Sequence, residues 1–204
     1  MLNLIFKNKP DTIVAIGISA ALSLLLLVPL FSIGLKSFLF LGGAFVVFLA
    51  LSLSTFLIGN ALSVRAPVFL QLAKFALVGG LSTAVELALL NLLFLIFGVT
   101  EGLGFSIFKT FTFGIALVNS YIFNKYWSFG AGVTVTHIEF GKFFLSNLVG
   151  LALNVGTASF IVNMLQSPYM VSSAQWANFA VVIAVTVTMT WNFFSYKFLV
   201  FRHS

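Results

Sequence analysis

One carboxylic acid lies deep in an apolar stretch of the sequence. Glu86 is about twelve residues from each end of the apolar run from Lys74 to Phe97. A charge at such a depth in a membrane costs about 2.5–3.5 kcal/mol or more, so an acid needs partners, water or a bound proton there. Glu86 could bind the hydroxyl groups of a polar ligand or exchange a proton. Alternatively, a protonated carboxyl group bonded to a neighbouring Asn or Thr would hold helices together.

Amide side chains are the next candidates for binding a polar ligand without using charge. The candidates are Asn119, Asn147, Asn154 and Asn192. Asn147 and Asn154 are seven residues apart, so both would lie near one face of a helix. The alternative role of each amide is an interhelical hydrogen bond, typically of about 0.6 kcal/mol.

Four lysines stand at the ends of apolar runs and could dock an anionic headgroup. They are Lys74, Lys125, Lys142 and Lys197. A phosphate at that depth would be attracted to their ammonium groups. The alternative is anchoring of the helix ends, with nonspecific attraction to anionic lipid of about 1 kcal/mol per basic residue.

The elements that position these residues follow from composition. The chain has 204 residues, of which 61% are hydrophobic and 7% are charged, whereas soluble domains have about 25% charged residues. Apolar runs of about 20 residues match the thickness of a bilayer, and they lack the alternation of barrel strands. The sequence therefore predicts an all-α integral membrane protein with six spans, the first capped by Asp11. These spans are residues 12–33, 37–60, 74–97, 107–126, 141–163 and 175–197.

Orientation follows from the basic residues in the short loops. With the N-terminus inside, eight basic residues fall on the cytoplasmic side: Lys7, Lys9, Arg65, Lys74, Lys125, Lys142, Lys197 and Arg202. Lys36 and Lys109 fall on the outer side. We therefore expect both termini to be cytoplasmic. The net charge of +6 then reflects membrane orientation rather than binding of nucleic acid.

Two similar segments, residues 72–129 and 140–201, indicate an internal repeat. Each opens with Lys-Phe, and each closes with an aromatic, basic segment. In the closing segments, Lys and Phe follow the opening polar residue, Ser120 or Asn192, by five and nine positions. Two helices per copy give a tandem parallel repeat, an arrangement found in transporters with the substrate site at the repeat interface. We expect residues 1–65 to form a separate, peripheral transmembrane hairpin, and residues 66–204 to form a four-helix domain.

At these residues the chain resembles the GtrA-like family of small membrane proteins. The resemblance covers about residues 70–202. The family pattern of Phe, Val and Gly followed by Thr and an acidic residue corresponds to the stretch from Phe75 to Glu86. The closing pattern N-F-x-x-x-R-x-x-V-F corresponds to residues 192–201, with Lys197 in place of Arg. A lysine presents a point charge where the planar guanidinium of arginine would bind phosphate through two hydrogen bonds.

The resemblance implies translocation of a polyprenyl-phosphate-linked sugar across the bacterial cytoplasmic membrane, for glycosylation of cell-surface polysaccharide. It also implies a partner glycosyltransferase, and a homodimer would thicken the thin helical wall. One alternative is a membrane scaffold that recruits the glycosyltransferase, and a second is a small-molecule exporter. The sequence has no cysteine, nucleotide-binding loop, metal cluster or catalytic set, so we expect neither catalysis nor a cofactor.

Overall fold

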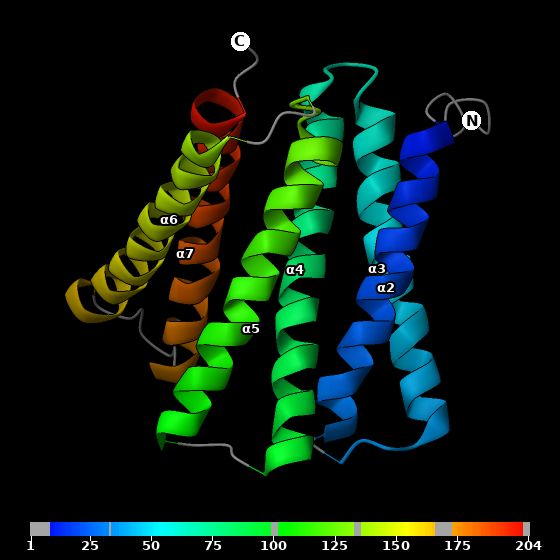
Figure 1. Ribbon diagram of the computed structural model, residues 1–204, viewed down its shortest axis with the longest axis vertical. Coiled ribbons are helices and arrows are strands. Elements are labelled where there is room, and N and C mark those ends of the chain that lie inside the picture. The colour runs from blue at the N-terminus through cyan, green and yellow to red at the C-terminus, as the bar shows by residue number, and fades with distance from the viewer. Residues whose placement is uncertain (1–8, 33, 99–101, 133–135, 166–172, 202–204) are drawn as a thin grey trace. The chain divides into compact units, whose positions relative to one another are not determined.

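A computed structural model describes residues 9–32, 34–98, 102–132, 136–165 and 173–201 of the chain. Within these residues every regular element is a helix (Figure 1). The α-helices are α2 (Lys9–Ser32), α3 (Phe38–Leu62), α4 (Val68–Phe97), α5 (Gly102–Phe123), α6 (His137–Met164) and α7 (Ser173–Ser195). Two short π-helices, η1 (Asn124–Ser128) and η2 (Tyr196–Val200), follow α5 and α7 directly.

The prediction of an all-α membrane protein is confirmed, with a helix at each of the six expected places. Among the described residues, α2, α3, α4 and the first 21 residues of α6 are long and apolar enough to cross a membrane. α4 has 30 residues and begins six residues before the predicted span. Two of the basic residues used for orientation, Lys7 and Arg202, lie outside the described residues.

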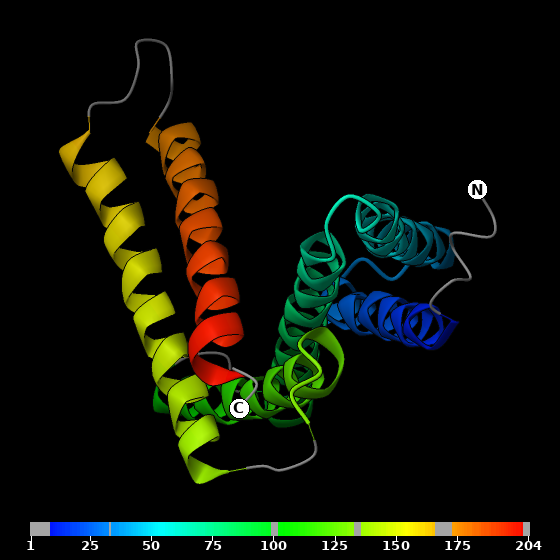
Figure 2. The ribbon, with the colours of Figure 1, turned by 90° about the horizontal axis from the view of Figure 1, so that it is seen from above.

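The chain divides into two compact units, residues 1–130 and 131–204. Unit 1 holds α2 to α5 with η1, and unit 2 holds α6 and α7 with η2 (Figure 2). Unit 1 therefore combines the N-terminal hairpin with the first repeat. The boundary expected between residues 65 and 66 stays a prediction.

The N-terminal hairpin packs closely on the first repeat, which differs from the peripheral position that we expected. Buried side chains of α2, including Ile18 and Leu22, meet Leu77 and Leu81 of α4, with Phe56 of α3 beside them. A lipid-exposed helix and a packed helix have equally apolar surfaces, so the hydropathy pattern did not distinguish the two positions.

α3 and α4 approach each other most closely at a glycine. A Cβ atom placed on Gly59 would lie 2.2 Å from the Cβ atom of Ala73 and 2.9 Å from the carbonyl oxygen of Phe69. Small residues at such contacts let helix backbones come close in membrane proteins. Gly59 thus fixes where α3 and α4 touch.

Local signals explain where two of the helices begin and end. α4 ends at Gly98, whose φ of 66° is the left-handed conformation that glycine adopts readily. α6 begins after Thr136, whose hydroxyl oxygen accepts a 3.1 Å hydrogen bond from the backbone nitrogen of Glu139. Thr136 and Glu139 stand in the Thr-x-x-Glu spacing of a capping box.

The two repeats end in the same way, although they lie in different units. Each π-helix starts one residue before the lysine of its closing segment, Lys125 or Lys197. In each, a phenylalanine nitrogen donates to the carbonyl oxygen five residues earlier. These bonds join Phe129 to Asn124 at 2.9 Å and Phe201 to Tyr196 at 2.8 Å.

Aromatic contacts extend this correspondence to the start of each repeat. The ring of Phe75 lies 6.3 Å from that of Phe129, and the ring of Phe143 lies 6.2 Å from that of Phe201. In both units the phenylalanine after the opening lysine therefore packs on the phenylalanine that ends the closing segment. Matching contacts at matching positions support the internal repeat.

Candidate functional site

Glu86 of α4 is paired with a cation from the neighbouring helix. Its carboxylate oxygen Oε1 accepts a hydrogen bond from Nζ of Lys109 on α5, and the two side chains are 17% and 46% exposed. The partner is therefore an ammonium group rather than the Asn or Thr that we considered. The ammonium supplies the charge compensation that an acid at this depth requires.

The sequence contained a signal for this pair that we did not use. α4 and α5 form an antiparallel hairpin, with Gly98 near its turn (Figure 1). Glu86 precedes Gly98 by twelve residues and Lys109 follows it by eleven, so the two residues lie at similar distances from the turn. We had placed Lys109 on the outer side, within a fourth span whose polar residues were expected to face other helices, but had not paired it with Glu86.

Asn119 and Ser82 form a second polar contact in the α4–α5 hairpin. Nδ2 of Asn119 donates to Oγ of Ser82 at 2.9 Å. This geometry fits the interhelical hydrogen bond that was the alternative role for Asn119. Glu86 lies one helical turn beyond Ser82 on α4, so the hairpin carries a short row of polar groups.

In unit 2, the predicted amides also bond across the helix pair. Nδ2 of Asn154 on α6 donates to Oγ1 of Thr188 on α7 at 3.2 Å. Asn147 accepts a 3.0 Å hydrogen bond from the hydroxyl group of Tyr196 at its Oδ1. Both amides thus have protein partners, and their roles in substrate binding stay predictions.

Among the predicted amides, Asn192 has a buried oxygen atom without a protein partner in the described part of the chain, a property that it shares with Oδ1 of Asn124. Its Oδ1 atom is buried and faces Gly150 of α6, where an added Cβ would lie 2.7 Å away. A buried carbonyl oxygen without a donor is costly in an apolar setting. Of the four predicted amides, Asn192 is therefore the one best placed to accept a hydrogen bond from a ligand or a water molecule.

Glu86 and Asn154 occupy corresponding positions in the two repeats. Each lies twelve residues after the lysine that opens its repeat, Lys74 or Lys142. Each also bonds to the second helix of its own repeat, through Lys109 or Thr188. The same place in the fold thus carries an ion pair in unit 1 and a neutral hydrogen bond in unit 2.

Lys125 and Lys197 have matching aromatic surroundings. Nζ of Lys125 lies 5.7 Å from the ring centroid of Tyr121, four residues earlier, and 5.9 Å from that of Tyr126. Nζ of Lys197 has equivalent distances of 5.8 and 5.7 Å to Phe193 and Phe198. A cation over aromatic faces is attracted to the ring electrons, so the two ammonium groups have corresponding aromatic neighbours, although Lys125 is fully buried and Lys197 is partly exposed.

The two lysines that open the repeats differ from each other. Lys142 is exposed. In contrast, Nζ of Lys74 lies 2.7 Å from Oδ2 of Asp11, and its side chain is only 12% exposed. Asp11 belongs to the first turn of α2, so the prediction that it caps this helix is wrong. Docking of an anionic headgroup by the four lysines stays a prediction.

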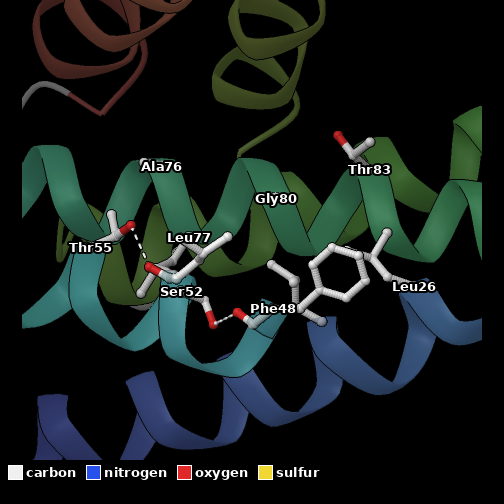
Figure 3. A pocket seen from close by; sticks show the side chains of 10 residues that line it. Leu26, Phe48, Ser52, Thr55, Ala76, Leu77, Gly80 and Thr83 are labelled. Carbon is white, nitrogen blue, oxygen red and sulfur yellow. Dashed lines mark hydrogen bonds between the residues drawn. The ribbon is translucent and has the colours of Figure 1, made fainter. Parts of the chain in front are cut away.

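An open groove of about 380 Å³ lies between α2, α3 and α4 (Figure 3). Its polar side chains are Ser52, Thr55 and Thr83. Each hydroxyl donates to a carbonyl oxygen of its own helix, at 2.8, 3.0 and 3.0 Å. The groove thus presents an apolar surface to an occupant, unlike the amides and charges of the repeats.

These features define a class: a multi-pass helical membrane protein whose polar groups lie inside tandem helix pairs. The family model that matches the chain is described as GtrA/DPMS, transmembrane domain, and it matches residues 74–201. The match covers more than half of the sequence, so the chain belongs to this family and the resemblance is confirmed. Comparison with curated proteins and with solved structures gives no match. The matched region begins at Lys74 and ends at Phe201, so it covers both repeats and leaves out the hairpin.

Proposed function

We propose that this protein translocates a polyprenyl-phosphate-linked sugar across the bacterial cytoplasmic membrane. The observation that carries the proposal is the family match over both repeats, since the family resemblance implies this substrate class. The ion pair and amides inside the helix pairs support it, because a sugar headgroup crossing an apolar layer needs polar partners. Glu86, Asn119, Asn147, Asn154 and Asn192 would contact the sugar.

Lys125 and Lys197 would dock the phosphate. Their aromatic neighbours hold both ammonium groups in corresponding positions, and lysine binds phosphate as a point charge. Lys142 is exposed and would assist them. The apolar groove of unit 1 would accommodate hydrocarbon, since it offers no unsatisfied hydroxyl group to a sugar.

The orientation and the partners belong to the same proposal. Both termini would face the cytoplasm, where a partner glycosyltransferase loads the sugar onto the lipid. The chain would not itself catalyse the reaction. A homodimer would enlarge the polar path beyond what the helices of one chain provide.

Translocation is tested in sealed liposomes that contain the polyprenyl-phosphate-linked sugar, with and without purified protein. A membrane-impermeant reagent that modifies the sugar is added outside, and the protected inner pool is measured over time. We expect the wild-type protein to speed the loss of this pool. Glu86→Gln should abolish the effect, and so should the combined variant Lys125→Ala with Lys197→Ala.

Glu139→Gln is the matched control, because it removes the same charge at the start of α6. Its activity should equal that of the wild type. If no lipid-linked sugar moves faster with the wild-type protein, the scaffold function becomes the better explanation. In that case, synthesis of the lipid-linked sugar by the glycosyltransferase would fall when the protein is absent.

A further inference from the structure

Three elements of unit 1 meet in a charged contact at one end of the helices. Asp11 comes from α2, Lys74 from α4 and Trp127 from η1. Oδ2 of Asp11 lies 2.7 Å from Nζ of Lys74, and Oδ1 accepts a 3.1 Å hydrogen bond from Nε1 of Trp127. Nζ of Lys74 also donates to the carbonyl oxygen of Trp127 at 3.4 Å and lies 5.5 Å from its ring centroid.

Lys74 and Trp127 together have the properties of an anion site. Each donates to a different oxygen of the same carboxylate, as two donors would engage two oxygens of a phosphate. The carbonyl oxygen and the ring of Trp127 hold the ammonium in place. The side chains of Lys74 and Asp11 are largely buried, at 12% and 22% exposed, so an anion would engage Lys74 only by taking the place of the Asp11 carboxylate.

In the described part of the second repeat, no acid is paired with the opening lysine. This lysine, Lys142, is exposed, and Leu199 stands at the position that corresponds to Trp127. Asp11 comes from the hairpin, which lies outside the family match. The hairpin therefore adds an acid to one of two otherwise similar lysines.

We propose that Lys74 and Trp127 form a phosphate site that Asp11 occupies until the phosphate of the lipid substrate displaces it. This inference rests on the proposed function, because it names a further contact for the same substrate. A tethered competitor lowers the apparent affinity by the fraction of time for which it leaves the site open. Asp11 thus sets how strongly the first repeat binds an anionic headgroup.

The test measures binding of geranyl phosphate to the purified full-length protein in lipid nanodiscs, with geraniol as the uncharged reference. Asp11→Asn should lower the dissociation constant for geranyl phosphate about tenfold and leave that for geraniol unchanged. Adding Lys74→Gln to Asp11→Asn should remove the gain. Glu139→Gln, which makes the same charge change in unit 2, should leave the affinity as in the wild type.

A charge-swapped variant separates binding from folding. Asp11→Lys combined with Lys74→Asp keeps an ion pair between α2 and α4, so thermal stability should stay near that of the wild type. The cation would move to α2, and a carboxylate at position 74 would face the carbonyl oxygen of Trp127 that holds the native ammonium, so geranyl phosphate binding should weaken.

The inference is overturned if Asp11→Asn binds geranyl phosphate no more tightly than the wild type. It is also overturned if Glu139→Gln gives an equal gain, or if the swapped variant binds as well as the wild type. Sugar-lipid translocation in liposomes is measured separately on the same variants. If the wild-type protein translocates the sugar lipid but Asp11→Asn binds geranyl phosphate no more tightly, only the role proposed for Asp11 is overturned. The proposed function then stands.

Discussion

Glu86 and Lys109 form an ion pair between two helices of a protein with few other charged side chains within its spans. Lys109 is 46% exposed, whereas Glu86 is 17% exposed. Removing one partner leaves the other charge uncompensated, which costs more than the net contribution of the pair itself. The stability of the α4–α5 hairpin should therefore depend on matching these two side chains rather than on either alone.

We expect Glu86→Gln and Lys109→Gln each to lower the free energy of unfolding. The double variant should be less destabilised than the sum of the two single changes, with a coupling of about 0.5–3 kcal/mol. Unfolding of the four proteins in detergent micelles would measure this coupling. Strict additivity would show that the ion pair contributes nothing to the native fold.

Asp11 shows what the sequence could and could not indicate at this scale. Its place after Pro10 was typical of a helix cap, but its carboxylate reaches Lys74 and Trp127 instead. Glu86 was identified because a lone acid stands out in an apolar run. Its partner Lys109 was not, because pairing depends on how α4 and α5 rotate about their axes, and uniformly apolar surfaces leave that rotation unspecified.

At the scale of elements, the sequence predicted where the helices lie but not which helices contact each other. Runs of apolar residues gave six helices at the right places, since bilayer thickness sets their length. The packing of α2 on α4 left no such pattern. It depends on shape, as at Gly59, where the absence of a side chain lets α3 meet Ala73 of α4.

Two glycines of α3 provide a matched test of this contact. Gly59→Ala should destabilise the protein by about 1–3 kcal/mol, because the added methyl group would overlap Ala73 and the carbonyl oxygen of Phe69. Gly43→Ala should be neutral or stabilising, since no atom lies within 4 Å of a Cβ at that position and alanine favours helix. Thermal unfolding in nanodiscs compares them. Equal melting temperatures would contradict the close approach of α3 and α4.

At the scale of the whole molecule, the proposed orientation places the α4–α5 turn outside and the start of α6 inside. It rests on the distribution of basic residues in the loops. The proposed translocation depends on it, because in that proposal the lysines of the closing segments face the compartment in which the lipid receives its sugar.

The absence of cysteine from the sequence makes this orientation directly measurable. Leu103→Cys and His137→Cys place single thiols at exposed positions near the starts of α5 and α6. In intact cells, an impermeant maleimide should label Cys at position 103 and should reach position 137 only after the membrane is permeabilised. Labelling of position 137 alone in intact cells would invert the proposed topology.

The two π-helices have a consequence for the history of the chain. A π-helix joins residues five apart through its backbone hydrogen bonds and is rare in proteins. Both copies carry theirs at the same register beside the closing lysine. A π-turn shared at the same register favours duplication of one helical hairpin over independent origin of the two copies. Residues 1–65, which contribute Asp11, lie outside the duplicated part and outside the family match.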